Sequence, residues 1–239
     1  MTQTAKPERA AWLGPIGAAC ITTAVVTVLS YGAPAEHAAS AVGLAFLGAT
    51  YWLALRDNAP DAARRHGLSL GGLLDPEPLD WPRLARSAAT ELGWALALSA
   101  IVFPLFWVGF VAWWSPPSPF RPAPVSGILD EALGQLLVIA LPEEAFYRGY
   151  LQTRLDEAWP PRSPILGACL GPGVVVASLI FALGHVATEL HPNRLAVFFP
   201  SLLFGWIRAR RRGIGCAAAF HALCNLFASY LARSYGLGA

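Results

Sequence analysis

The sequence predicts an all-α integral membrane protein, a bundle of about seven transmembrane helices. Of its 239 residues, 55% are hydrophobic and only 13% are charged, whereas charged residues make up about 25% of an average soluble domain. The mean hydropathy is +0.48. Five long runs contain no Asp, Glu, Lys or Arg: 10–35, 37–55, 92–120, 163–188 and 213–232. Because about 20 apolar residues suffice for a helix to cross the hydrocarbon layer, each run predicts a crossing.

The first two predicted crossings lie within residues 10–35 and 37–55. Lys6 and Arg9 precede the first run and Ala33-Pro34-Ala35 ends it, which is the order of a cleavable secretory signal. The run is longer than the apolar core of such signals, which has about 7 to 15 residues. We therefore expect the first helix to be retained.

Two segments on either side of the third crossing, 92–120, predict surface structure. Residues 56–84 combine arginines with spaced leucines and then prolines, which end any helix. We expect a short amphipathic segment there, on the inner membrane surface. The five prolines of 115–124 predict an extended outer loop. Three histidines in loops or turns are expected to be solvated: His37, His66 and His191.

Turn signals add two crossings, at 132–150 and 194–207, within a single domain spanning 1–239. With the N terminus inside the cell, fourteen Lys and Arg residues fall on the inner side and three on the outer side, in accordance with the positive-inside rule. The Ala- and Arg-rich composition with short loops indicates a bacterial source. We therefore expect a multi-pass protein of the bacterial inner membrane with a cytoplasmic N terminus. The net charge of +2, without a longer polybasic arm, argues against a nucleic acid partner.

The segment 132–150 differs from the other crossings because it carries Glu143, Glu144 and Arg148. A charge at the centre of a membrane helix costs about 2.5 to 3.5 kcal/mol on insertion scales, and such residues usually face a cavity and have a function. Pro142 removes a backbone donor, so a kink is expected where the carboxylates enter. In the alternative interpretation, the helix ends early and Glu144 pairs with Arg148 on its surface. The uncharged stretch before Glu143 is too short to span the bilayer alone, which favours the intramembrane interpretation.

Two later crossings carry polar side chains at helical spacing. Phe181 and His185 are four residues apart, as are His221 and Asn225, so each pair shares one face of its helix. A single histidine on an apolar helix is more often a hydrogen-bonded packing residue than a functional one. Two imidazoles, a carboxamide and a carboxylate pair on three helices, however, are the groups needed to bind and activate a water molecule inside a membrane.

These three patterns, in this order, resemble the CPBP intramembrane protease family. The stretch from Glu143 to Arg148 fits its EExxxR motif, Phe181 to His185 fits FxxxH, and His221 to Asn225 fits HxxxN. The family includes the Ras-converting CAAX prenyl proteases and bacterial bacteriocin-processing or self-immunity proteins. The resemblance extends over about residues 128–231.

The resemblance implies an active site between the fourth, fifth and seventh helices. It implies an endopeptidase that hydrolyses a bond near the C-terminal tail of a membrane-anchored or lipid-modified protein, within the lipid bilayer. Glu143 would be the general base and His185 would hold the same water. His221 and Asn225 would donate hydrogen bonds to the oxyanion. The supporting residues would be Glu144 and Arg148, as an ion pair, and Phe181.

Three alternatives stay open at this point. A metalloprotease-like version would bind zinc through Glu143, His185 and His221. The sequence lacks HExxH, which places two ligands and a base on one helix, so no cofactor is the favoured expectation. A thiol protease would use Cys224, but this residue is expected to point away from the His221 face. A non-enzymatic membrane immunity protein would keep its function without Glu143.

Overall fold

The computed structural model describes residues 11–57 and 59–237, so Lys6 and Arg9 lie outside the described residues. The predicted helical bundle is confirmed. Many large apolar side chains point outward from it, as expected of a surface that faces lipid. Five helices are long and apolar enough to cross a membrane: α1 (Leu13–Gly32), α2 (Ala35–Thr50) with its π-helical continuation η1 (Tyr51–Leu55), α4 (Trp81–Trp114), α8 (Pro172–Glu189) and α10 (Gly215–Ser234).

A further helical run, residues 128–158, is here called the central helix. Its segments are α5 (Ile128–Leu133), the π-helix η3 (Gly134–Ala140), α6 (Leu141–Glu144), the π-helix η4 (Ala145–Gln152) and α7 (Thr153–Ala158). The short α-helical turn that carries Pro142 and both glutamates therefore lies between two π-helical stretches. Wider π-turns re-aim side chains and often mark functional sites. They occur here where the sequence predicts a proline kink.

The predicted crossing at 194–207 differs from the structure in both type and length. Residues Pro192–Val197 form a 3₁₀ helix, η5, and α9 begins only at Phe198 and ends at Arg211. At about 1.5 Å per residue, the 14 residues of α9 extend about 21 Å, less than the roughly 30 Å of the hydrocarbon layer. Of the about seven predicted crossings, five thus have the length and composition of a span in the described part of the chain.

The uncharged run 163–188 does not begin as a helix. Strands β1 (Ser163–Ile165) and β2 (Ala168–Leu170) form an antiparallel hairpin, with Ser163 opposite Leu170. Leu166 and Gly167 form its two-residue turn with φ values of 47° and 78°, the left-handed conformation that tight hairpin turns require. The hairpin lies against α9, where the Trp206 indole donates a 3.0 Å hydrogen bond to the Ile165 carbonyl. Only α8, which follows it, enters the bundle.

The expected solvated position of His66 is wrong. The segment that precedes α4 contains the short helix α3 (Ala62–Arg65) and the 3₁₀ helix η2 (Leu70–Gly72). Between them, His66 and Leu68 are buried, and the His66 Nδ1 lies 2.9 Å from the carbonyl oxygen of Gly149. The segment therefore packs onto the central helix. His37, which lies within α2, and His191 are exposed, as predicted.

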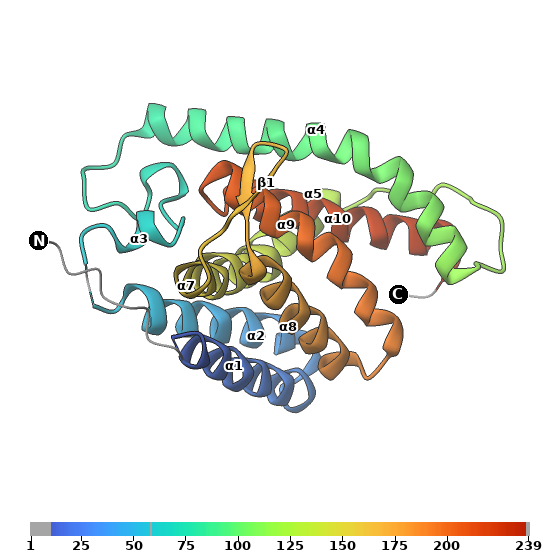
Figure 1. Cartoon of the computed structure of the whole chain (residues 1–239). Helices are drawn as coiled ribbons and strands as arrows, with labels where there is room; N and C mark the ends of the chain where they lie inside the picture. Colours follow the sequence, from blue (N-terminus) through green and yellow to red (C-terminus); the bar gives the residue numbers. More distant parts are fainter. Residues whose placement is uncertain (1–10, 58, 238–239) are drawn as a thin grey trace, which may run out of the picture.

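The central helix lies inside the bundle, between α2, α8 and α10. Figure 1 shows α4 along one side of the molecule and the α1–α2 pair along the opposite side. Among the five spanning helices, α4 packs against α10, and α1 packs against α2 and α8. The charged segment is therefore shielded from lipid on several sides, which explains how a bundle can hold its glutamates and arginine.

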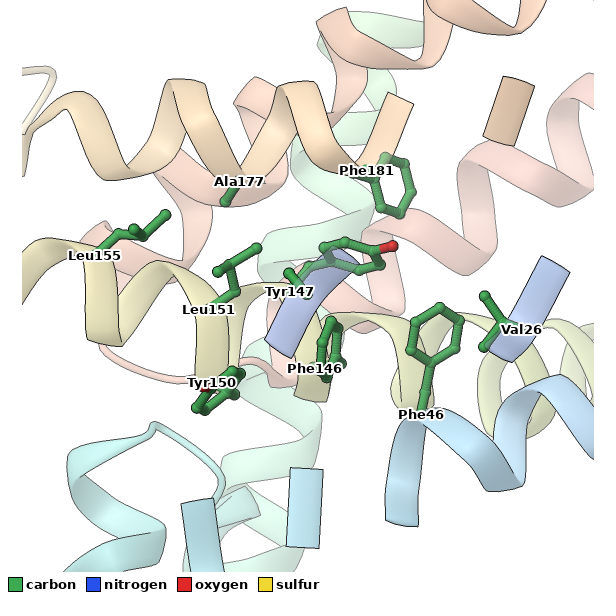
Figure 2. Packing of buried hydrophobic residues seen from close by; sticks show 10 residues of the cluster. Val26, Phe46, Phe146, Tyr147, Tyr150, Leu151, Leu155, Ala177 and Phe181 are labelled. Atoms are coloured by element: carbon green, nitrogen blue, oxygen red, sulfur yellow. The ribbon is translucent and has the colours of Figure 1, made fainter. Parts of the chain in front are cut away.

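Buried aromatic and aliphatic side chains fix the central helix in place (Figure 2). The Phe146 ring packs on Phe46 of α2 with centroids 5.4 Å apart, and the Tyr147 ring meets Phe181 of α8 edge-on at 5.0 Å. Edge-on and offset geometries are the favourable arrangements for aromatic pairs. Leu151 and Leu155 continue the same buried face toward α8. The apolar cluster thus fixes the position of the central helix relative to α2 and α8.

The two ends of the bundle differ in charge, as the distribution of arginines predicts. One end gathers α3, α7, the hairpin, the end of α9 and the start of α4, together with most of the arginines. At the other end, the 115–124 loop lies beside the end of α10, where the Arg121 amide donates to the Ser234 carbonyl at 2.8 Å. The predicted extended outer loop therefore caps the end of the bundle with few arginines.

Candidate active site

A buried ion network links the central helix to α10. The Glu144 carboxylate lies 3.2 Å from Arg148 Nε and 3.1 Å from His221 Nδ1, and the side chains of Glu144 and Arg148 are fully buried. The Arg148 Nη2 group also donates a 2.9 Å hydrogen bond to the Ser201 hydroxyl of α9. Three elements therefore meet at one buried carboxylate. The interpretation of Glu144 and Arg148 as a surface pair is wrong.

Aromatic rings enclose this network. The Arg148 guanidinium lies 5.2 Å from the ring centre of Phe181 and 5.7 Å from that of Phe204. The His221 ring stacks on Phe204 at 4.7 Å with an interplanar angle of 17°. The negative faces of aromatic rings attract a cation that has lost its water, so both phenylalanines stabilise the Arg148 guanidinium inside the bundle.

Glu143 lies next to the network without belonging to it. Its Oε2 atom is 3.9 Å from His221 Nε2, and only 12% of its side-chain surface is exposed. This Oε2 atom is buried and has no hydrogen-bond partner within residues 11–57 and 59–237. A buried polar atom without a partner is unfavourable and calls for a functional explanation. The two nitrogens of His221 thus face two different carboxylates.

His185 lies on the α8 side of the same region, and its ring and that of His221 both pack against Phe181. The His185 Nδ1 atom is 3.0 Å from the carbonyl oxygen of Phe181, one helical turn earlier. The Phe181 ring centre is 4.4 Å from the His185 ring and 5.9 Å from the His221 ring. A neutral His185 that donates through Nδ1 has a free Nε2 acceptor. No hydrogen bond or ion pair joins His185 to Glu143 or His221 in the described structure.

Asn225 follows His221 by one turn of α10 and has a partner on the central helix. Its Nδ2 group donates a 2.9 Å hydrogen bond to Gln135 Oε1 in η3. Farther along the same two helices, Arg233 binds Glu131 at 3.0 Å. Polar contacts therefore recur along this helix pair. An amide nitrogen carries two hydrogens, so Asn225 retains one donor after binding Gln135.

The predicted zinc ligands do not form a metal site in this geometry. Within the part of the chain that the structure describes, no three His, Cys, Asp or Glu side chains are grouped as metal ligands. Glu143 and His221 are close, whereas no ion pair or hydrogen bond joins His185 to either of them in the described structure. The predicted set therefore offers two neighbouring ligands, fewer than the three that catalytic zinc sites use.

Most of the residues predicted from sequence meet in one region, and several of their partners were not predicted. Gln135 carries a signal that could have been noticed, because an amide in an otherwise apolar membrane segment usually has a partner. Ser201 and Phe204 carry no such signal, since serine and phenylalanine are common in membrane helices. Cys224, the thiol alternative, packs with the apolar cluster of α9, α10 and α4.

Part of the chain is similar to a known protein family. Residues 124–227 match the family model described as type II CAAX prenyl endopeptidase Rce1-like. Through this stretch, the chain is similar to the CAAX protease family. The match begins at the end of the 115–124 loop and covers the central helix, α8, α9 and the part of α10 that carries His221 and Asn225. Comparison with curated proteins and with solved structures gave no match.

The similarity covers the part of the chain in which the buried charges are concentrated. All seven residues of the three sequence motifs, and Ser201 and Gln135 with them, fall inside the matched stretch. Helices α1, α2 and α4 lie outside it and pack around it as support.

Two clefts lie elsewhere, at the arginine-rich end, and contain neither Glu143 nor His221. The smaller, of about 280 Å³, is lined by Asp156, Arg208 and their neighbours at the start of α7 and the end of α9. Burial raises the pKa of Asp156 to about 6 from the usual 3.8, although Gln152 and Arg208 act in the opposite direction.

Proposed function

We propose that this protein is an intramembrane endopeptidase in which Glu143 and His221 together activate the attacking water. The observation that carries the proposal is the 3.9 Å separation of Glu143 Oε2 from His221 Nε2. A water oxygen about 2.8 Å from both atoms would see them at an angle of about 90°, near the angle between the two O–H bonds of water. Such a water donates to both acceptors and directs its lone pairs outward, toward a peptide carbonyl.

The state of His221 follows from its other nitrogen. The Glu144 carboxylate, beside the Arg148 guanidinium, accepts a hydrogen bond from His221 Nδ1–H. This bond places the proton of a neutral imidazole on Nδ1 and leaves Nε2 as an acceptor. Glu144 and Arg148 are thus positioning residues for His221. Glu143 then takes the proton from water during attack, as general base.

The roles of His185 and Asn225 follow from the polar atoms that they leave free. Asn225 keeps one Nδ2 hydrogen after binding Gln135, and we assign it to the developing oxyanion. His185, whose Nδ1 donates to the Phe181 carbonyl, keeps Nε2 as an acceptor on the α8 side of the site, and we assign it to orienting the peptide. In this scheme His221 accepts a hydrogen bond from the water, whereas the sequence-based expectation is that His221 donates a hydrogen bond to the oxyanion.

The substrate class follows from the setting of the site. Its charges lie within a bundle whose outer surface is apolar, so the peptide reaches it from the bilayer or its boundary. A bond near the C-terminal tail of a membrane-anchored or lipid-modified protein fits this setting and the family that residues 124–227 match. We place the protein in the bacterial inner membrane, with the arginine-rich end toward the cytoplasm.

The decisive comparison is between membranes that contain the wild-type protein and the Glu143→Gln variant, analysed by mass spectrometry for uncut C-terminal tails. Glutamine keeps the size of the side chain but cannot take a proton from water, so uncut tails are expected to accumulate. Glu189→Gln, at an exposed carboxylate paired with Arg194, is the matched control and should cleave as wild type. A variant that is well expressed and still processes tails would contradict the proposal, whereas a non-enzymatic immunity protein would keep its phenotype in Glu143→Gln.

Zinc-dependent catalysis is the alternative mechanism for the same site. We propose metal-free catalysis because Glu143 and His221 suffice to bind the water, and no group of three metal ligands is found among the described residues. Full cleavage by the purified protein in the presence of a chelator is expected. Activity that disappears with chelator and returns only with added zinc would establish the metal-dependent alternative.

A further inference from the structure

A cationic cleft of about 350 Å³ lies at the arginine-rich end, outside the candidate active site. Five of its six lining residues belong to the first turns of α4 and one to the end of α9. They are Arg83, Arg86, Ser87, Thr90, Glu91 and Arg211. Figure 1 shows the beginning of α4 at the same end of the molecule as α3.

The positive charges of the cleft exceed the negative ones. Arg211 holds Glu91 through two contacts, Nη2 to Oε1 at 2.8 Å and Nε to Oε2 at 3.3 Å. Arg86 donates only to the Pro82 carbonyl, at 3.3 Å, and has no carboxylate within 4.0 Å among the described residues. Arg83 lies 3.5 Å from Asp75 and remains about half exposed. Two guanidinium groups therefore offer donors to an anion.

Tryptophans show at which level of the membrane the cleft lies. Trp81 and Trp94, on α4, precede and follow its cleft residues, and 69% and 38% of their respective surfaces are exposed. The Arg211 guanidinium lies 5.3 Å from the ring centre of Trp94. Exposed tryptophans concentrate at the boundary between hydrocarbon and water, where lipid headgroups lie. Beyond Trp94, α4 continues as an uncharged apolar helix to Trp114.

We propose that this cleft binds the phosphate group of an anionic phospholipid. Planar guanidinium groups match phosphate oxygens with paired hydrogen bonds, and the hydroxyls of Ser87 and Thr90 lie beside them. Basic pockets between membrane helices at the cytoplasmic boundary are suited to anionic headgroups. The apolar face of α4 beyond Trp94 is exposed at Leu96 and Ile101, where acyl chains would lie.

A bound lipid would also connect elements that carry the site. It would join the start of α4 to Arg211, four residues before α10 begins at Gly215. Because α10 holds His221 and Asn225, we expect an anionic lipid to stabilise the folded bundle. This inference does not depend on the proposed reaction, since none of the lining residues belongs to the candidate active site.

The test is lipid retention by the purified full-length chain, measured by native mass spectrometry with phosphatidylglycerol and with phosphatidylcholine. Wild type should retain phosphatidylglycerol at least tenfold better than phosphatidylcholine. The double variant Arg83→Gln/Arg86→Gln should lose this preference. The control Arg162→Gln/Arg210→Gln removes the same charge from exposed positions at the same end and should keep it.

Two results would overturn the lipid assignment. One is equal retention of phosphatidylglycerol by the cleft variant and the control, which would show that total charge, and not the cleft, holds the lipid. The other concerns inorganic phosphate in phosphatidylcholine nanodiscs. If millimolar phosphate raises the unfolding temperature of wild type as much as phosphatidylglycerol does, the cleft takes free phosphate. The variant Arg83→Lys/Arg86→Lys, which retains the charge, is expected to keep part of the preference for phosphatidylglycerol.

Discussion

Replacing Arg148 by leucine tests the buried ion network most severely. The substitution removes the guanidinium that lies 3.2 Å from Glu144 and donates to Ser201, and it leaves the Glu144 carboxylate fully buried with His221 as its remaining partner. Breaking a buried pair by removing one partner costs about 3 to 5 kcal/mol. The interactions of the cation with Phe181 and Phe204 are lost in addition. Because the free energy of unfolding of a folded protein is only about 5 to 15 kcal/mol, the substitution removes a large part of it.

The assay is denaturant unfolding of the protein in defined micelles, with Arg194→Leu as the reference. Arg194 and Glu189 form an exposed pair beyond the end of α8, and such pairs contribute about 0 to 1 kcal/mol to the free energy of unfolding. We expect Arg148→Leu to lose several times more stability than Arg194→Leu. The double variant Glu144→Gln/Arg148→Leu should recover part of the loss, since no buried carboxylate is left unpaired. Equal losses for Arg148→Leu and Arg194→Leu would refute the network as described.

Three further predictions concern residues beside the site. Gln135→Leu should lower kcat about tenfold with little change in KM, because Asn225 loses the partner that orients it. Gln135→Glu keeps an acceptor for Asn225 and should retain more activity. Removal of an oxyanion donor itself typically lowers kcat by about 10²–10³. Because burial raises the pKa of Asp156 to about 6, the folded state holds its proton more tightly than the unfolded state between about pH 4 and 6, so stability falls as the pH rises through this window. Thermal unfolding of Asp156→Asn should lack this fall and show a gain of at most about 3 kcal/mol above pH 6; an unchanged pH profile would contradict it. Cys224→Ala should cleave at the wild-type rate, and loss of all activity would revive the thiol mechanism.

The sequence contains enough information to predict the spanning helices and the identity of the polar residues. Length and hydropathy define a crossing because lipid cannot satisfy backbone groups, so helices such as α1 and α10 are visible in the composition alone. The i,i+4 spacing of His221 and Asn225 likewise fixes a common helix face without any knowledge of the fold. These features depend on neighbours in the sequence.

Features that depend on contacts between distant segments could not be predicted. His66 is buried because the Gly149 carbonyl of the central helix lies 2.9 Å away, a contact between residues 83 positions apart. The hairpin at 163–170 depends on the left-handed turn at Leu166 and Gly167 and on the flank of α9, and its uncharged sequence resembles the start of a helix. The two π-helical stretches around Pro142 were foreseen only as a kink.

The pairing of His221 with both glutamates is the most informative of these distant contacts. Sequence spacing places Glu143 and Glu144 on one helix and His221 on another, but it does not say which carboxylate faces which ring nitrogen. The structure places Glu144 on Nδ1 and Glu143 on the side of Nε2. The proposed division of roles between positioning residue and base follows from this difference.

The central claim is that Glu143 takes a proton from a water shared with His221. The most direct measurement is the single-turnover rate of tail cleavage by purified protein in phosphatidylglycerol nanodiscs with a chelator present. The wild-type protein should cleave, Glu143→Gln should be slower by about 10²–10⁴, and the Glu189→Gln control should match wild type. A Glu143→Gln rate within a few-fold of wild type, with the fold intact, would contradict the claim.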